Sequence, residues 1–251
     1  MEKTISDIKL EFENADMNHM KILLHDYQND QRLGVKKLLY KYNKKLEAYR
    51  SEKKRTEKMF FYEKQYKTYR VICGIDEVGR GPLAGPVTAC AVILDPKKEI
   101  LYLNDSKKLS EKKREELYKE IMEKAISVAV AEADWNRIDE INILQADYEA
   151  MRKAIKKLSP QPELLLNDAV TIPEISIRQV PIIHGDALSA SIAAASIVAK
   201  VTRDRQMVEY DKKFPEYGFA ANKGYGTKEH IAALKKYGPS PIHRKSFLKN
   251  L

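Results

Sequence analysis

A chain of 251 residues, 43% of them hydrophobic, is long enough for one domain with a substantial core plus an appendage, or for two small domains. The longest apolar run, residues 188–199, contains three serines and is shorter than the roughly 20 residues that a membrane-spanning helix needs. The start of the sequence lacks a secretory pattern, and the two cysteines, Cys73 and Cys90, lie in apolar segments typical of core thiols. We therefore expect a globular, cytoplasmic protein that makes no membrane contact.

The first 70 residues differ from the rest in composition, hydrophobic pattern and charge. Residues 1–68 contain no proline and a single glycine, and their apolar residues recur at helical spacings, which predicts two or more helices. Residues 32–70 carry 14 basic and 4 acidic side chains, interleaved with eight aromatic rings, whereas residues 71–251 carry 28 and 25. Such a stretch could bind nucleic acid, or it could be a solvated helical face whose rings pack on the main domain. We predict a helical basic extension over residues 1–70, a possible substrate-binding arm, ahead of a domain over residues 71–251.

Beyond residue 70, short apolar runs separated by turn residues predict strands. Three of them are expected to form an antiparallel meander, at residues 71–75, 86–94 and 99–103. Ser110 is a favoured helix N-cap, so a helix is expected from there to about residue 125, followed by an alternating strand at residues 128–133.

The second half of the chain alternates between helices and strands. A helix over residues 143–158 precedes the apolar strand 164–166, which delivers Asp168. A strand is expected at residues 175–180, and then a long helix over residues 187–211, whose small side chains would let it lie close on a sheet. The helical C-terminal tail comprises a loop at residues 222–226, a short helix from Thr227 and a last segment at residues 239–247. This order predicts an α/β domain with a mixed sheet.

Four acidic residues occupy positions where a metal ion could bind. Asp76 and Glu77 end an apolar strand and could share a site only if the strand ends or twists between them, which the following glycines make plausible. A hard divalent ion commonly stabilises such adjacent carboxylates, although an exposed strand end explains them as well. Asp168, at the tip of a buried strand, needs exposure or a partner. Asp186 precedes the long helix, where it could also serve as an N-cap.

The glycines that follow Glu77 do not form a dinucleotide-binding turn. Gly79 and Gly81 are followed by Pro82 and another strand pattern, whereas a phosphate-binding turn of that kind should open a helix.

Six segments, in order along the chain, resemble the motif series of the ribonuclease HII family. They are residues 74–86 (GIDEVGRGPLAGP), 104–109 (NDSKKL), 185–186 (GD), 194–204 (AASIVAKVTRD), 223–227 (KGYGT) and 240–244 (SPIHR). The resemblance implies a ribonuclease H-like mixed sheet flanked by helices. It also implies four active-site acids that hold Mg²⁺ or Mn²⁺, and these match Asp76, Glu77, Asp168 and Asp186.

The same resemblance implies residues that bind the substrate. A Gly-Arg-Gly turn, which matches Gly79, Arg80 and Gly81, would contact the ribose 2′-hydroxyl, aided by Tyr225. Phosphate contacts are expected from basic residues that could equally be solvated surface charges: Lys107, Lys108, Lys200 and Arg244. One departure is His184, at a position that is often lysine in the family.

We therefore expect a metal-dependent endoribonuclease that acts on RNA/DNA hybrids and on duplex DNA containing ribonucleotides, as a monomer. By resemblance it would cut on the 5′ side of a single ribonucleotide and leave 5′-phosphate and 3′-hydroxyl ends. Two alternatives remain: a non-catalytic hybrid-binding protein, which the four acids disfavour, and a related enzyme of the ribonuclease HIII type. A DNA-specific nuclease of the same fold is disfavoured by the match at residues 79–81 and Tyr225.

Overall fold

The computed structural model describes residues 3–249, which divide into two compact units, the residues up to Glu57 and those from Lys58 onward. The described part of the first unit is built from α1 (Ile5–Asn14), α2 (Met17–Asp26) and most of α3 (Leu33–Met59). Thr4 and Asp7 form a capping box at the start of α1. Apolar residues of the three helices form the core of this unit, in which the Phe12 ring stacks on Tyr42 with centroids 4.5 Å apart. The predicted N-terminal helices are confirmed.

The second unit contains a five-stranded mixed sheet in the order β3-β2-β1-β4-β5. The strands are β1 (Ile72–Val78), β2 (Val87–Ile93), β3 (Ser127–Ala133), β4 (Leu164–Asp168) and β5 (Arg178–Ile182). β1, β2 and β3 pair antiparallel, while β4 pairs parallel with both β1 and β5. The predicted mixed α/β sheet is therefore confirmed, with the last strand displaced towards the C-terminus from residues 175–180.

The prediction of a strand at residues 99–103 is wrong, and β3 is the third strand of the meander. Ile100 and Leu103 are buried, but they pack in a cluster with residues of α5 (Glu111–Lys124) and α9 (Ala190–Lys213). Between them, Tyr102 has a φ of 67°, which is incompatible with a strand. This apolar run therefore belongs to a loop that packs on helices. The predicted Ser110 cap is confirmed, because its hydroxyl accepts from the Lys113 N–H at the start of α5.

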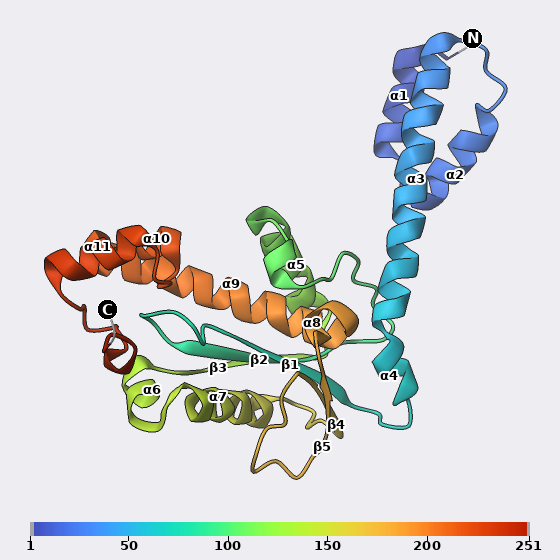
Figure 1. Cartoon of the computed structure of the whole chain (residues 1–251). Helices are drawn as coiled ribbons and strands as arrows, with labels where there is room; N and C mark the ends of the chain where they lie inside the picture. Colours follow the sequence, from blue (N-terminus) through green and yellow to red (C-terminus); the bar gives the residue numbers. More distant parts are fainter. Residues whose placement is uncertain (1–2, 250–251) are drawn as a thin grey trace. The chain divides into compact units, whose positions relative to one another are not determined.

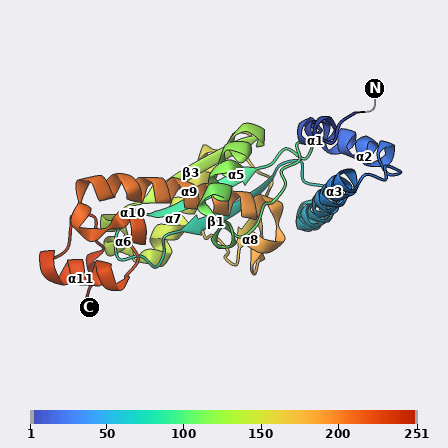
Figure 2. The same cartoon turned by 90° about the horizontal axis from the view of Figure 1, so that it is seen from above.

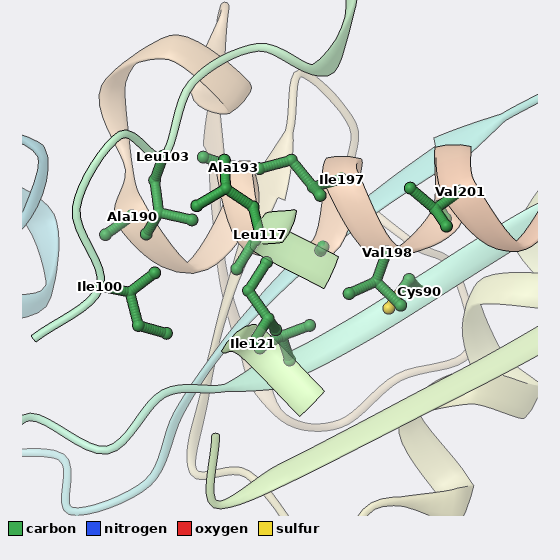
Figure 3. Packing of buried hydrophobic residues seen from close by; sticks show 14 of the residues in the cluster. Cys90, Ile100, Leu103, Leu117, Ile121, Ala190, Ala193, Ile197, Val198 and Val201 are labelled. Carbon is green, nitrogen blue, oxygen red and sulfur yellow. The ribbon is translucent and has the colours of Figure 1, made fainter. Parts of the chain in front are cut away.

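Helices cover both faces of the sheet. α9 and α5 pack on the face formed by Cys90 and Val92, while α7 (Ile143–Lys157) packs on the opposite face (Figures 1 and 2). Figure 3 shows Cys90 of β2 beside Val198 of α9, within a cluster that also includes Leu117. Cys73 and Cys90 are buried free thiols, as expected. This layered packing fixes the strand ends that carry the acidic residues.

Short helices connect these elements and complete the tail. They are α4 (Phe61–Gln65), η1 (Ser106–Lys108), α6 (Trp135–Ile141), α8 (Gly185–Leu188), η2 (Pro215–Tyr217), α10 (Phe219–Asn222), α11 (Lys228–Tyr237) and η3 (Lys245–Phe247). Glu63 of α4 accepts hydrogen bonds from the Ser189 hydroxyl and from the N–H and hydroxyl of Ser191, and thus ties α4 to the start of α9. Among residues 3–249, no helix is both long enough and apolar enough to cross a bilayer.

Candidate active site

Three of the four predicted acids come together at one end of the sheet. Asp76 lies on β1, Asp168 ends β4 and Asp186 lies on α8. One ligand atom from each carboxylate lies within 4.8 Å of those of the other two. Residues more than 100 positions apart in sequence therefore form a single group of oxygen donors.

Close backbone packing brings these carboxylates together. Gly74 lies so near α9 that a Cβ built on it would be 2.1 Å from the carbonyl carbon of Ser191, so only glycine fits there. This approach places the α9 face of β1, which includes Asp76, directly under the helix. The Gly185 N–H donates to Asp168 Oδ1 at 2.7 Å, which links the tip of β4 to α8. The main chain thus orients two of the three acids.

The structure corrects the N-cap interpretation of Asp186. This residue lies inside the first turn of α8, whose N-cap position is His184 with a left-handed φ of 58°. The long helix α9 begins later, and the hydroxyl of Ser189 accepts from the Ile192 N–H at its N-cap. Asp186 therefore caps neither helix, and its carboxylate belongs to the acidic group.

Burial and mutual repulsion raise the pKa values of Asp76 and Asp186. Asp76 is only 5% exposed, and burial, reinforced by the negative charge of Glu77, raises its pKa well above the usual range. Burial also raises the pKa of Asp186, to which the neighbouring carboxylates of Asp105 and Asp168 contribute. A buried group of like charges is unfavourable without a cation, so these residues fit a divalent metal site.

Glu77, the fourth predicted acid, is separated from this group by the strand geometry. β1 continues to Val78, so Glu77 points to the α7 face and Asp76 to the α9 face. The expected strand end between the two acids is absent. Glu77 Oε1 lies 3.8 Å from Arg80 Nη1, and burial raises its pKa, with a smaller opposing effect from Arg80.

Beneath Arg80 lies Asp147, an acid of α7 that the sequence patterns did not single out. Its side chain is completely buried, and neither carboxyl oxygen has a hydrogen-bond partner within the described residues. The contact of 3.6 Å with Arg80 Nε is too long for a hydrogen bond, and burial together with Glu77 raises the pKa of Asp147 to about 8. The effect of burial on the pKa of Asp147 therefore outweighs the opposing effect of Arg80.

Two buried arginines hold the Gly-Arg-Gly turn and the segment that follows it through main-chain carbonyl groups. Arg244 donates to the carbonyls of Gly79, Arg80 and Gly85, at 2.6, 2.9 and 2.9 Å. Arg203 donates in the same way to the carbonyls of Ala84, Pro86 and Lys223. With its carbonyls bound from behind, the turn has a fixed main-chain conformation.

Gly79 is the position where that conformation excludes a side chain. Its φ is 93°, and an added Cβ would lie 2.3 Å from Nε of Arg203. At the other end of the turn, a Cβ on Gly81 would lie 3.8 Å from the Tyr225 ring. Tyr225 is 40% exposed and sits on a loop joined to the turn by the Leu83 N–H, which donates to the Gly224 carbonyl. The structure thus places the Gly-Arg-Gly turn beside Tyr225.

The four predicted phosphate contacts have different surroundings. Lys107 is close enough to favour the charged forms of Glu77 and Asp186, whereas Lys108 lies 3.8 Å from Asp105. Lys200 forms an ion pair of 2.7 Å with Asp204. Arg244 is fully buried and leaves no surface for a phosphate, so for this residue the prediction of a direct contact is corrected to a role in holding the turn.

Sequence patterns missed several residues around the site. Asp105 was visible within a motif but had no assigned role, and Arg203 was indistinguishable from a solvated helical charge. The sequence signal for Arg203 is its place in a helix segment of alanines and valines, which the sheet buries. His230 and His243 behind Tyr225 gave no separate signal, because their contact depends on the fold of the C-terminal tail.

Comparisons with known proteins agree with this geometry. The family model described as Ribonuclease HII matches residues 73–250, and that described as Ribonuclease HII N-terminal domain matches residues 4–67. Ribonuclease HII of Lachnoclostridium phytofermentans is 65% identical over 98% of this chain and 97% of its own length, and that of Clostridioides difficile is 49% identical over 100% and 99%. The crystal structure of ribonuclease H2 from Pyrococcus horikoshii matches with a TM-score of 0.59 and 28% identity, covering 70% of this chain and 93% of that one. The chain therefore belongs to the ribonuclease HII family and is a metal-dependent ribonuclease H.

Proposed function

We propose that this enzyme hydrolyses the RNA strand of RNA/DNA hybrids and also cuts on the 5′ side of a single ribonucleotide embedded in duplex DNA. The products would carry 5′-phosphate and 3′-hydroxyl ends, a chemistry suited to ribonucleotide removal and RNA primer processing. The observation that carries the proposal is the acidic group of Asp76, Asp168 and Asp186, in which Asp76 lies on β1, the strand that leads directly into the Gly79–Gly81 turn.

The residues present fit divalent metal ions. The group offers carboxylate oxygens, the donors that Mg²⁺ and Mn²⁺ prefer, and the burial of Asp76 makes an uncompensated charge there costly. We infer that Asp76, Asp168 and Asp186 hold the metal. Glu77 lies outside this group on the other face of β1, but its charge interacts with those of Asp76 and Asp168, so it is near enough to turn towards a bound ion and complete the set. Two such ions, when bound, would activate a water molecule and stabilise the leaving 3′ oxygen.

The side chains and main chain around these acids would position the substrate. The Gly185 N–H orients the Asp168 carboxylate, and Lys107 offers a positive charge near Glu77 and Asp186 for the scissile phosphate. Lys108 and Lys200 would contact phosphates further along the strand. Each of them lies near an aspartate, Asp105 and Asp204 respectively, which a phosphate would have to replace as partner.

Recognition of the ribonucleotide is assigned to the turn and to Tyr225. Arg244 binds the Gly79 and Arg80 carbonyls from behind, and Arg203 binds those of Ala84 and Pro86 just after the turn, so the remaining polar groups of the turn are held ready for a ligand. The Tyr225 ring beside Gly81 would contact the same nucleotide. The 2′-hydroxyl distinguishes RNA from DNA, and a site built to pair with it rejects the analogue lacking it by a factor on the order of 10⁴. DNA without ribonucleotides should therefore be essentially inert.

The basic stretch of the N-terminal unit is proposed to add general affinity for the substrate. Residues 33–57 form most of α3 and are rich in lysine and arginine, so they could neutralise phosphates. The salt dependence of substrate binding distinguishes this proposal from the alternative, in which the extension is purely structural.

The test compares three duplexes of one sequence that contain one ribonucleotide, four ribonucleotides or none. The proposal predicts rapid cutting of the first two and no cutting of the third. Comparable rates on all three, or a requirement for four ribonucleotides, would exclude recognition of a single 2′-hydroxyl. A hybrid-binding protein without catalytic activity would bind the first two duplexes and cut neither.

A further inference from the structure

A chain of buried polar groups runs behind the loop that carries Tyr225. Nδ1 of His230 lies 2.9 Å from the main-chain carbonyl oxygen of Tyr225, and Nε2 of His230 lies 2.9 Å from Nε2 of His243. Nδ1 of His243 lies 2.9 Å from the Ser240 main-chain nitrogen and 2.8 Å from the Ser240 hydroxyl. His230 is 0% exposed and His243 2%, so these contacts are shielded from water.

The direction of every hydrogen bond in this chain follows from its fixed ends. The Ser240 N–H can only donate, so Nδ1 of His243 accepts and the proton of a neutral His243 lies on Nε2. That N–H donates to Nε2 of His230, which leaves the His230 proton on Nδ1. Nδ1 then donates to the Tyr225 carbonyl, which can only accept. One arrangement of two neutral tautomers therefore satisfies both imidazole rings, the Ser240 N–H and the Tyr225 carbonyl.

The segment that contains His243 also holds the Gly-Arg-Gly turn. Its next residue, Arg244, donates to the carbonyls of Gly79, Arg80 and Gly85, and the Gly85 N–H donates to the Ile242 carbonyl. His243 pairs with Ala84 in an isolated β-bridge. Residues 240–244 therefore bind both structures on which recognition of the ribonucleotide is proposed to depend.

We propose that His230 and His243 are positioning residues that set the Tyr225 main chain, and hence the place of its ring, relative to the Gly-Arg-Gly turn. The inference rests on the proposed function for its link to cleavage, because that function assigns Tyr225 to the ribonucleotide. The histidines themselves are buried and do not touch substrate. Their fixed tautomers make the loop rigid without a covalent link.

The rings packed around the pair favour this rigid arrangement. The Phe219 ring lies edge-on to His230 with centroids 5.4 Å apart, and the Tyr217 ring lies 5.0 Å from His243. These contacts restrict both imidazoles to the planes that the hydrogen bonds require. A ring flip of either histidine would replace a nitrogen in the chain by a carbon and would leave buried polar groups unpaired.

The first test reads the tautomers directly and needs no activity. In the full-length protein labelled with ¹⁵N at histidine, NMR at pH 7.5 should show His243 protonated at Nε2 alone and His230 at Nδ1 alone. The exposed His25 should show fast proton exchange with solvent, which provides an internal reference. A His230 with its proton on Nε2, or either ring doubly protonated at this pH, would overturn the hydrogen-bond chain.

The second test uses a matched pair of amides at position 230. In His230→Asn, the amide nitrogen can take the place of Nδ1 and still donate to Tyr225, whereas in His230→Gln the amide oxygen can take the place of Nε2 and only the link to His243 remains. We expect His230→Gln to lower kcat on the one-ribonucleotide duplex by about tenfold or more, since misplaced groups near the chemistry cost this much. His230→Asn should retain more of the kcat, and KM should change little in both.

Thermal stability and a double-mutant cycle separate positioning from general damage. If the histidines merely stabilise the fold, kcat in the two variants will follow their melting temperatures rather than the retained hydrogen bond, and the inference fails. If they act through Tyr225, the effect of His230→Gln should largely disappear in the Tyr225→Ala background. His25→Asn, the same change on an exposed histidine, should be neutral throughout.

The outcomes distinguish failure of this inference from failure of the proposed function. Should Tyr225→Ala cut the one-ribonucleotide duplex at the rate of the unaltered enzyme, the assignment of Tyr225 is wrong, whatever the tautomers are. Should Tyr225→Ala be slow while His230→Gln, correctly folded, is fully active, Tyr225 keeps its role and the positioning by histidines is refuted.

Discussion

The buried histidine pair predicts a specific loss of stability in mild acid. Burial, with a contribution from His230, lowers the pKa of His243 to about 4 from an ordinary value of 6.5. The unfolded chain therefore takes up a proton at a pH where the folded protein does not. The stability that comes from keeping the ring neutral is fully present above pH 6.5 and is lost as the pH falls towards 4.

The magnitude follows from the two pKa values. The full difference corresponds to about 3 kcal/mol, at 1.36 kcal/mol per pKa unit. Between pH 7.5 and 5.0 the free energy of unfolding should fall by about 2 kcal/mol through this group alone. Other groups also titrate over this range, so the relevant quantity is the difference in the free energy of unfolding between the unaltered protein and His243→Asn. This variant lacks the imidazole ring, but its side-chain oxygen can still accept from the Ser240 N–H.

Urea unfolding at pH 7.5 and at pH 5.0, followed by circular dichroism, measures this difference. His243→Asn should be less stable than the unaltered protein at pH 7.5, and the gap should narrow by about 2 kcal/mol at pH 5.0. A gap that stays constant between the two values would show that His243 titrates alike in the folded and unfolded chains. The reasoning about its burial and its contact with His230 would then be refuted.

Four further predictions concern the acids, the turn and the basic helix. Asp168→Asn should abolish cleavage in Mg²⁺ while the circular dichroism spectrum stays unchanged, because it removes ligand charge at constant volume, and full activity would contradict the metal assignment. Asp147→Asn should be more stable than the unaltered protein at pH 8.5, because a carboxyl with a raised pKa costs stability as the pH rises. This advantage should shrink markedly at pH 5, and urea unfolding at both values checks the sign. Gly79→Ala should strain the backbone by about 1 kcal/mol or more and slow cutting of a single ribonucleotide. Unfolding and cleavage assays measure this against Gly218→Ala, a positive-φ position where an added Cβ would make only an ordinary contact of 3.7 Å with the Asn222 side chain. Deleting residues 3–57 should flatten the dependence of hybrid affinity on salt by about 0.9 in slope for each phosphate that the basic helix neutralises in the full-length protein, and an unchanged slope would make this helix structural.

The deletion ends at residue 57 because the structure places the boundary between the two units there, and not at residue 70. A deletion up to residue 68, near the end of the predicted extension, would also remove Met59 and Phe60, which pack in the cluster around α9. Glu63 also binds the start of that helix. A truncation at residue 68 would therefore damage the second unit and confuse affinity with stability.

Strand placement from sequence succeeded where apolar runs are buried on both faces. β2 and β4 lie in the middle of the sheet or against α9, so their continuous apolar residues gave a clear pattern. The run at residues 99–103 had a similar composition but is buried by helices, and a local pattern does not reveal which element covers it. Sequence resemblance supplied the acids Asp76, Asp168 and Asp186, which the fold then brought together.

The supporting residues could not be predicted because their roles depend on distant partners. Arg244 was expected at a phosphate, yet the turn it holds is more than 150 residues away in sequence. Asp147 occupies an ordinary helical position, and its burial under Arg80 follows only from the packing of α7 on the sheet. Charged side chains are mostly exposed, so sequence alone favours the surface interpretation for both.

The most direct test of the central claim maps the cut on a DNA duplex that contains one ribonucleotide. Each strand would be labelled at its 5′ end in one reaction and its 3′ end in another, with Asp168→Asn as the inactive control. We predict one cut, on the 5′ side of the ribonucleotide, with a 3′-hydroxyl on the upstream fragment and the ribonucleotide on the 5′-phosphate end of the downstream fragment. A cut on the 3′ side, a cyclic phosphate end, or equal cutting by Asp168→Asn would contradict the account.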